Sequence, residues 1–200
     1  MSGWRVTWVL SALLLAAFGT IVAIYGTDEE GLHVLVRATA RISFLVFLPV
    51  YVAAPLRRLW RTDTTRWLVK NRRYLGVGFF VAHMLHLNAI WLLSILQGDM
   101  FRSPLVTVVG GGLAYVLIVA MAFTSSDRAV AWLGPARWRT LHRVGIHYVA
   151  FIWLLQWTPL ALLESPAYVP LALLMVAAFG IRFAGRPRRA GAGAPVAATS

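Results

Sequence analysis

Hydrophobic and polar positions divide the chain into six long apolar stretches separated by shorter polar connections. The stretches cover residues 4–25, 38–56, 74–96, 105–123, 138–157 and 168–183. A helix needs roughly 20 mostly apolar residues to cross about 30 Å of hydrocarbon, and all but the last stretch approach or exceed that length. The last carries Pro170 in its first turn, where proline is tolerated. The pattern therefore predicts an all-α fold, a polytopic membrane bundle of six transmembrane helices.

Basic residues are divided unevenly between the two sets of connections. All but three of the 19 lysine and arginine residues lie before the first stretch, between the second and third, between the fourth and the start of the fifth, or at the end of the sixth. The exceptions are Arg37, Arg41 and Arg102. Cytoplasmic loops attract lysine and arginine, so we expect both ends of the chain in the cytoplasm and a location in the cell inner membrane or plasma membrane. The first stretch is too long for a signal-peptide core, and we expect it to be a membrane span.

Composition supports a membrane environment. Hydrophobic residues make up 60% of the chain and charged residues 13%, whereas a soluble chain is nearer a quarter charged. Membrane lipid is therefore the predicted partner of most of the surface. The net charge of +12 is explained by span orientation and contact with anionic headgroups, so we expect no nucleic-acid partner. The absence of cysteine excludes disulfides, thiolate metal sites and iron–sulfur clusters.

Four histidines are the main candidates for chemistry. Ionisable groups inside a membrane are costly and usually mark function. The predicted spans contain no aspartate or glutamate, which argues against a proton pump or cation transporter. They contain His83 and His86 in the third stretch and His142 and His147 in the fifth. Neutral imidazole is a common axial ligand of haem, and two facing helices can offer one ring to each side of the iron. Two alternatives remain open. The histidines could form polar contacts between helices, or they could bind zinc, although their spacing is not that of a dedicated zinc motif.

Spacing limits how these histidines can act together. His83 and His86 lie roughly 60° apart around a helix and can face one neighbour. His142 and His147 lie about 140° apart, so they cannot both point at one centre. If the third and fifth spans enter from the same side, His83 and His147 reach similar depth and could form a mid-membrane pair.

Two arginines and a glycine run are further candidates. Arg41 near the outer face and Arg72 near the inner face could each pair with a haem propionate. Arg41 could instead reach the outer headgroups, and a positive-inside role suffices for Arg72. The run 110–112, three glycines in the fourth span, allows close approach of a flat ligand or, more simply, of another helix.

Three ordered segments carry a family resemblance. The first runs from Thr39-Ala40-Arg41 to Ala54-Pro55-Leu56-Arg57-Arg58, the second from Arg72-Arg73-Tyr74-Leu75-Gly76 to His86, and the third from Thr124-Ser125 through Leu133-Gly134 and Trp138 to Leu141-His142-Arg143. Over roughly residues 35–160 the chain resembles the ferric-reductase-like transmembrane domain family. Within that family it is most similar to the haem-binding membrane subunits of the bacterial periplasmic methionine sulfoxide reductase system.

The resemblance implies a haem b protein, with one or two haems and with His86 and His142 as axial ligands. The family's third ligand histidine would fall 13 or 14 residues beyond His142, where this chain has Leu155 and Gln156. Fourteen residues of helix span about 21 Å and return to nearly the same face, so a histidine pair at that spacing could serve two stacked haems. The departure leaves the second haem and the ligand pairing open.

We therefore expect an electron-transfer subunit of an oxidoreductase system, one that relays electrons from the cytoplasmic side to an outer-face acceptor. The chain has no glycine-rich dinucleotide fingerprint, so the predicted donor is a separate reductase, a loosely bound flavin or membrane quinol. A haem-free scaffold or assembly partner and a small-molecule transporter are the alternatives. We expect one domain over residues 1–189 and a disordered tail over residues 190–200, which are rich in small residues.

Overall fold

The computed structural model describes residues 2–98 and 105–184, and every regular element in these ranges is helical. The elements are α1 Trp4–Tyr25, α2 Glu29–Leu59, α3 Asp63–Gln97, α4 Leu105–Phe123, α5 Asp127–Leu133, α6 Pro135–Pro159, the π-helix Leu160–Glu164, the 3-10 helix Pro166–Tyr168 and α7 Val169–Ala184. The predicted all-α membrane bundle is confirmed. The predicted tail and Arg102 lie outside the described residues.

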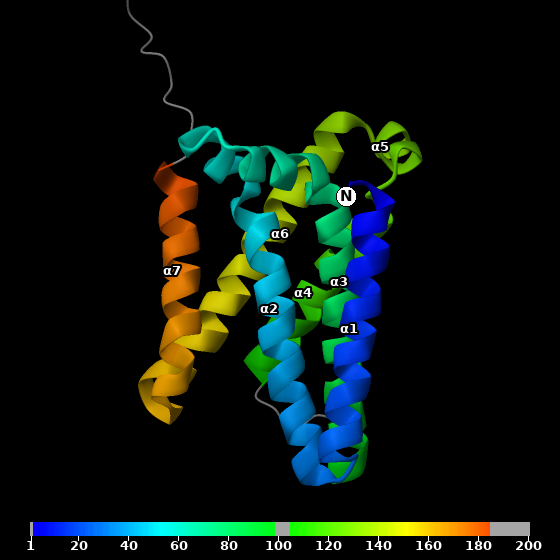
Figure 1. Cartoon of the computed structure of the whole chain (residues 1–200), viewed down its shortest axis with the longest axis vertical. Helices are drawn as coiled ribbons and strands as arrows, with labels where there is room; N and C mark the ends of the chain where they lie inside the picture. The colour runs from blue at the N-terminus through cyan, green and yellow to red at the C-terminus, as the bar shows by residue number, and fades with distance from the viewer. Residues whose placement is uncertain (1, 99–104, 185–200) are drawn as a thin grey trace, which may run out of the picture.

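Five helices in the described part are long and apolar enough to cross a membrane, and α4 makes a sixth if it is counted together with α5 as one broken span. The two parts of that pair are bent by 107°. The long helices run side by side, and the N-terminus, the α2–α3 connection, α5 and the end of α7 lie at one end of the bundle (Figure 1). We call this the basic end because it carries the arginine-rich connections. The chain is a multi-pass membrane protein.

Two helices start earlier than the hydrophobic pattern predicts. α2 begins at Glu29, and the side chain of Asp28 caps it by accepting a 2.9 Å hydrogen bond from the Gly31 N–H. α3 begins at Asp63, where Thr62 and Thr65 form a reciprocal capping box. The first part of α3 lies across the basic end before the helix turns along the bundle (Figure 1). Hydropathy detects only the lipid-crossing part of such helices, whereas polar capping residues set where they begin.

The core is aromatic and formed mainly by α2, α3 and α6. Phe44 of α2 packs against Trp153 and Trp157 of α6, with ring centroids 5.4 Å and 5.6 Å apart. The outer surface is apolar too, since Trp8 and Leu163 are 71% and 84% exposed. Lipid, unlike water, solvates such a surface.

A proline in α2 explains how α7 is attached. Pro55 has no N–H to donate to the carbonyl of Tyr51 one turn earlier. The guanidinium of Arg182 on α7 donates to that carbonyl instead, and it lies 4.5 Å from the centroid of the Tyr51 ring. The Tyr51 carbonyl, which lacks its usual partner within α2, thus forms a hydrogen bond between α2 and α7.

Candidate cofactor site

His83 lies in the middle of the bundle, held by three neighbouring helices. Its Nδ1 is 2.8 Å from the hydroxyl of Ser43 on α2. Its ring stacks on Tyr115 of α4 at 4.5 Å and meets the edge of Trp153 of α6 at 5.6 Å. The side chain is only 7% exposed. These contacts confine His83 on several sides.

His86 lies one turn further from the basic end and contacts Thr39 of α2. Its Nδ1 is 3.1 Å from the Thr39 hydroxyl. That hydroxyl gives its own hydrogen to the carbonyls of Leu35 and Val36, at 2.7 Å and 3.1 Å. With its hydrogen used in this way, Thr39 accepts from the Nδ1–H of His86, and that tautomer leaves Nε2 with a lone pair. A second residue that fixes the tautomer in this way is typical of a metal-ligating histidine.

His142 has a similar arrangement near the basic end. Its Nε2 is 3.2 Å from the hydroxyl of Thr124, in the turn directly after α4, and that hydroxyl donates to the carbonyl of Ala120 at 2.6 Å. Nε2–H is therefore the donor and Nδ1 keeps its lone pair. Trp138 packs on the imidazole at 4.4 Å and donates its own N–H to the Thr124 carbonyl.

His147 has both ring nitrogens engaged. Its Nδ1 donates to the Arg143 carbonyl at 2.6 Å, and its Nε2 accepts from Arg182 at 3.0 Å. To ligate iron through Nε2, His147 would have to lose its hydrogen bond from Arg182. The structure therefore gives His147 a role in joining α6 to α7.

His86 and His142, the two histidines with a free ring nitrogen, lie at different distances from the basic end. α3 and α6 both run away from the basic end (Figure 1), and His83 meets Trp153. His142 precedes Trp153 on α6 by about 16 Å of helix, and His86 follows His83 on α3 by about 4.5 Å. His86 and His142 thus lie on the order of 20 Å apart along the bundle. They cannot ligate the same iron.

His83 and His147, which the sequence left as a possible pair, do not contact each other in the described structure. Trp153, which contacts His83, lies about 9 Å of helix beyond His147. The two histidines therefore differ in depth by about that amount. Among the described residues, no group of three or more His, Cys, Asp or Glu side chains gathers to hold a metal ion.

Leu155 and Gln156 occupy the two positions where the resemblance places a third ligand. They follow the buried Trp153 on α6, where Leu155 is 51% exposed and Gln156 is exposed as well. Neither position carries an imidazole, and neither side chain belongs to the buried core.

The two arginines lie at different ends of the site. Arg41 covers the ring of Tyr168 at 5.3 Å, and Tyr168 in turn stacks on Trp157. Arg72 lies within electrostatic range of His142 and donates through Nε to the Val50 carbonyl at 3.2 Å. Neither arginine forms a salt bridge with a carboxylate among the described residues. Both are thus suited to an anionic group such as a propionate.

Two buried donors without partners, on Tyr115 and Trp153, lie against His83, and a third, on Trp157, stacks on Trp153. Tyr115 Oη, Trp153 Nε1 and Trp157 Nε1 are buried and have no hydrogen-bond partner in the described structure. Each such group costs about 1–3 kcal/mol if it stays unpaired. Of the glycine run, Gly110 packs against Ile152 and Tyr148 of α6, whereas Gly112 is exposed. Free imidazole nitrogens and unpaired donors together fit a ligand with acceptor groups.

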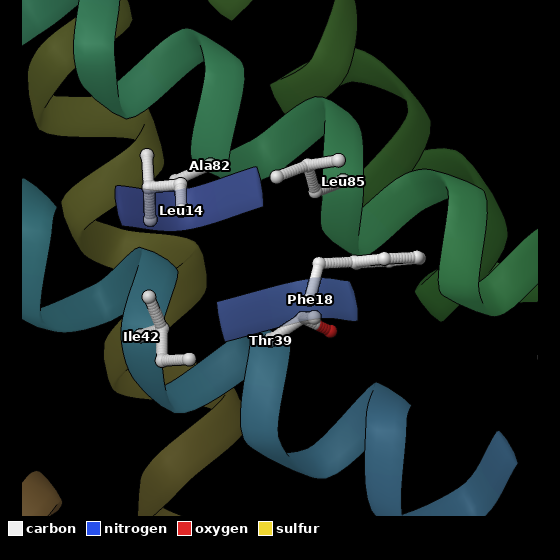
Figure 2. A pocket seen from close by; sticks show the side chains of 6 residues that line it. All are labelled: Leu14, Phe18, Thr39, Ile42, Ala82 and Leu85. Carbon is white, nitrogen blue, oxygen red and sulfur yellow. The ribbon is translucent and has the colours of Figure 1, made fainter. Parts of the chain in front are cut away.

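One small cavity also borders Thr39. It has a volume of about 10 Å³ and lies between α1, α2 and α3, with Leu14, Phe18 and Ala82 on its walls (Figure 2). A space of this size holds about one water molecule. Its walls are apolar apart from Thr39, and it is too small for a cofactor.

Sequence reasoning missed the three hydroxyl residues that hold the histidines, Ser43, Thr39 and Thr124. Thr39 and Thr124 belong to the segments that carry the family resemblance, but their role depends on which face of each helix meets its neighbour. A small hydroxyl inside an apolar span is the signal that points to such residues, since it needs a hydrogen-bond partner there.

Comparisons with known proteins agree on one group of relatives. No family model and no solved structure matches the chain. A protein from Azospira oryzae is 34% identical over 159 residues, which cover 74% of this chain and 63% of the relative. One from Cronobacter sakazakii is 31% identical over 161 residues, which cover 74% of this chain and 77% of the relative. A third, from Ralstonia nicotianae, is 33% identical over 142 residues, which cover 66% of this chain and 63% of the relative.

Fold and site define a multi-pass helical membrane protein with an imidazole-containing interior. Each of the three relatives bears the name protein-methionine-sulfoxide reductase heme-binding subunit MsrQ. The chain belongs to this family, which confirms the predicted resemblance. It spans 63% of the length of the Ralstonia and Azospira relatives.

Proposed function

We propose that the chain is a haem b-binding membrane subunit that relays electrons to a methionine sulfoxide-reducing partner. The names of its relatives support haem and that reductase system. The observation that carries the proposal is the pair His86 and His142, each fixed by a threonine through one ring nitrogen and free at the other. Bound haem supplies a one-electron carrier inside the lipid.

His86 and His142 act at two separate levels. Their spacing, on the order of 20 Å along the helices, covers a large part of the roughly 30 Å of hydrocarbon. Each imidazole holds an iron from its own helix, and Thr39 and Thr124 keep the rings in place. Arg72 at the His142 level and Arg41 on the side away from the basic end bind propionates. His83 and His147 serve as polar contacts between helices.

The basic end faces the cytoplasm in this proposal, and electrons move from it toward the opposite face. Lysine and arginine favour the cytoplasmic side, so both chain ends lie inside. The donor at that face is a reductase protein, a loosely bound flavin or membrane quinol. The acceptor is an outer-face protein.

A visible spectrum of the purified protein, reduced minus oxidised, tests the proposal, with haem quantified per chain. We expect a b-type spectrum in the wild type, a partial loss in His86→Ala and in His142→Ala, and near-normal haem content in His147→Ala. No haem in protein from haem-replete cells contradicts the proposal. That result favours the second candidate, a haem-free scaffold, which the missing imidazole near Gln156 supports.

A further inference from the structure

An open groove lies at the junction of α5 and α6, at the basic end of the bundle. It has a volume of about 610 Å³, and its walls come from the end of α5 and the first half of α6: Leu133, Ala136, Arg137, Thr140, Leu141 and Val144. Volumes of this size are typical of sites that bind small molecules. None of the candidate ligand histidines lines the groove, so it is a feature separate from the site described above.

Contacts outside the groove hold its two helices in place. Arg73 of α3 donates to the carboxylate of Asp127, at the start of α5, at 2.7 Å. Gly134 joins α5 to α6 with a φ of 82°, a backbone conformation that favours glycine. The shape of the groove therefore follows from the fold and needs no ligand to form it.

The groove changes from charged to apolar along α6. This helix runs away from the basic end (Figure 1), so Arg137 lies near that end, and Leu141 and Val144 lie about 6 Å and 10.5 Å deeper. Val144 is 55% exposed. Thr140 donates its hydrogen to the carbonyl of Ala136 at 3.1 Å, so it requires no acceptor from a ligand. This order fits an amphiphilic molecule with its polar group at the basic end.

The positive charge of the groove is not neutralised by a carboxylate. Arg137 is exposed and forms no salt bridge with a described acidic residue. Between residues 124 and 163 the only acidic residue is Asp127, against four arginines, and its carboxylate already accepts from Arg73. Trp132, at the end of α5, is 83% exposed, which suits the headgroup level of a membrane, where tryptophan is enriched. An anionic headgroup complements this charge.

We propose that the groove binds an anionic phospholipid of the leaflet at the basic end. Its phosphate pairs with the guanidinium of Arg137, and an acyl chain lies along Leu141 and Val144. Basic residues at the membrane surface attract anionic lipids, and the apolar wall beneath the arginine adds the contact that a soluble phosphate compound does not make. The site requires no haem, so it stands apart from the proposed function.

Native mass spectrometry of the full-length protein in mild detergent tests the proposal, by titration with phosphatidylglycerol or phosphatidylcholine of the same acyl chains. We expect tighter binding of phosphatidylglycerol to the wild type and about a fivefold loss in Arg137→Gln, the usual contribution of one basic residue. The matched control Arg139→Gln removes the same charge roughly 200° around the helix, at a residue that does not line the groove, and should bind as the wild type does. Val144→Trp keeps the charge but fills the groove, so it should weaken the binding of both lipids.

Three results overturn the proposal. Equal affinities of the wild type for the two lipids exclude selection of an anionic headgroup. Equal losses in Arg137→Gln and Arg139→Gln show attraction by surface charge in general. Competition by inorganic phosphate at the same concentration as the lipid shows an anion site that does not use the acyl chain. Haem content, measured on the same samples, should be unchanged in Arg137→Gln, and its absence in the wild type contradicts the proposed function alone.

Discussion

At the scale of single residues, hydroxyl groups decide which nitrogen of each histidine is available. Thr39 can accept from His86 only because its own hydrogen is bonded to the Leu35 and Val36 carbonyls. Thr124 does the same for His142 through Ala120. Buried polar groups are thus used to orient candidate ligands.

Thr39→Val is expected to lower haem affinity by about 10–100-fold, the usual cost of losing a residue that orients a metal ligand. Haem titration of apo-protein, followed by absorbance, measures it. Thr39→Ser keeps the hydroxyl and should bind nearly normally. Thr7→Val is the control, since it removes a buried hydroxyl that bonds to the Tyr74 carbonyl. Equal loss in Thr39→Val and Thr7→Val would point to general destabilisation.

Pro55 and Arg182 should be energetically coupled. Arg182→Met is expected to lower stability by about 1.5–3 kcal/mol, because it removes charged hydrogen bonds. In a Pro55→Ala background the new N–H can bond to the Tyr51 carbonyl, so the same substitution should cost less. A double-mutant cycle of unfolding in detergent measures the coupling. An identical cost in both backgrounds argues against the carbonyl contact as the link.

At the scale of elements, close helix packing depends on a few glycines. A Cβ added at Gly31 would collide with the backbone carbonyls of Tyr25 and Gly26 in the α1–α2 turn, whereas one at Gly19 meets nothing within 4 Å. Backbone atoms cannot move aside as the end of a side chain can. The turn that places α2, and with it Thr39, therefore requires glycine at 31.

Gly31→Ala is expected to destabilise the protein by at least about 1–3 kcal/mol, the usual cost of forcing extra atoms into a packed site. Gly19→Ala, the matched control in α1, should be neutral or slightly stabilising, since alanine favours helix. Unfolding midpoints in one detergent compare the two. Similar midpoints for both variants would show that the turn can rearrange.

At the scale of the whole molecule, the unequal distribution of charge sets orientation. The basic end collects the arginine-rich connections, while Asp28, Glu29 and Glu164 lie near the opposite end. A green fluorescent protein fused after Ser200 should fluoresce, and alkaline phosphatase at the same point should be inactive, because the proposed orientation puts the C-terminus in the cytoplasm. The same phosphatase inserted beside Glu164 should be active. Active phosphatase at the C-terminus would reverse the proposed orientation.

The sequence alone predicted the spans and the histidines worth examining. Membrane crossing follows from the hydropathy summed along one helix. A histidine inside an apolar run can be recognised in the sequence however the helices pack. Such properties depend only on residues close together in the chain, so they can be found without a structure.

Tertiary structure decided which histidines can act together. Sequence left His83 and His147 as a possible pair, but the register of α3 against α6 separates them in depth. The packing of α7 against α6 also engages His147 in a hydrogen bond from Arg182. These outcomes depend on the rotation, tilt and register of helices far apart in the chain, which local hydropathy and spacing do not encode.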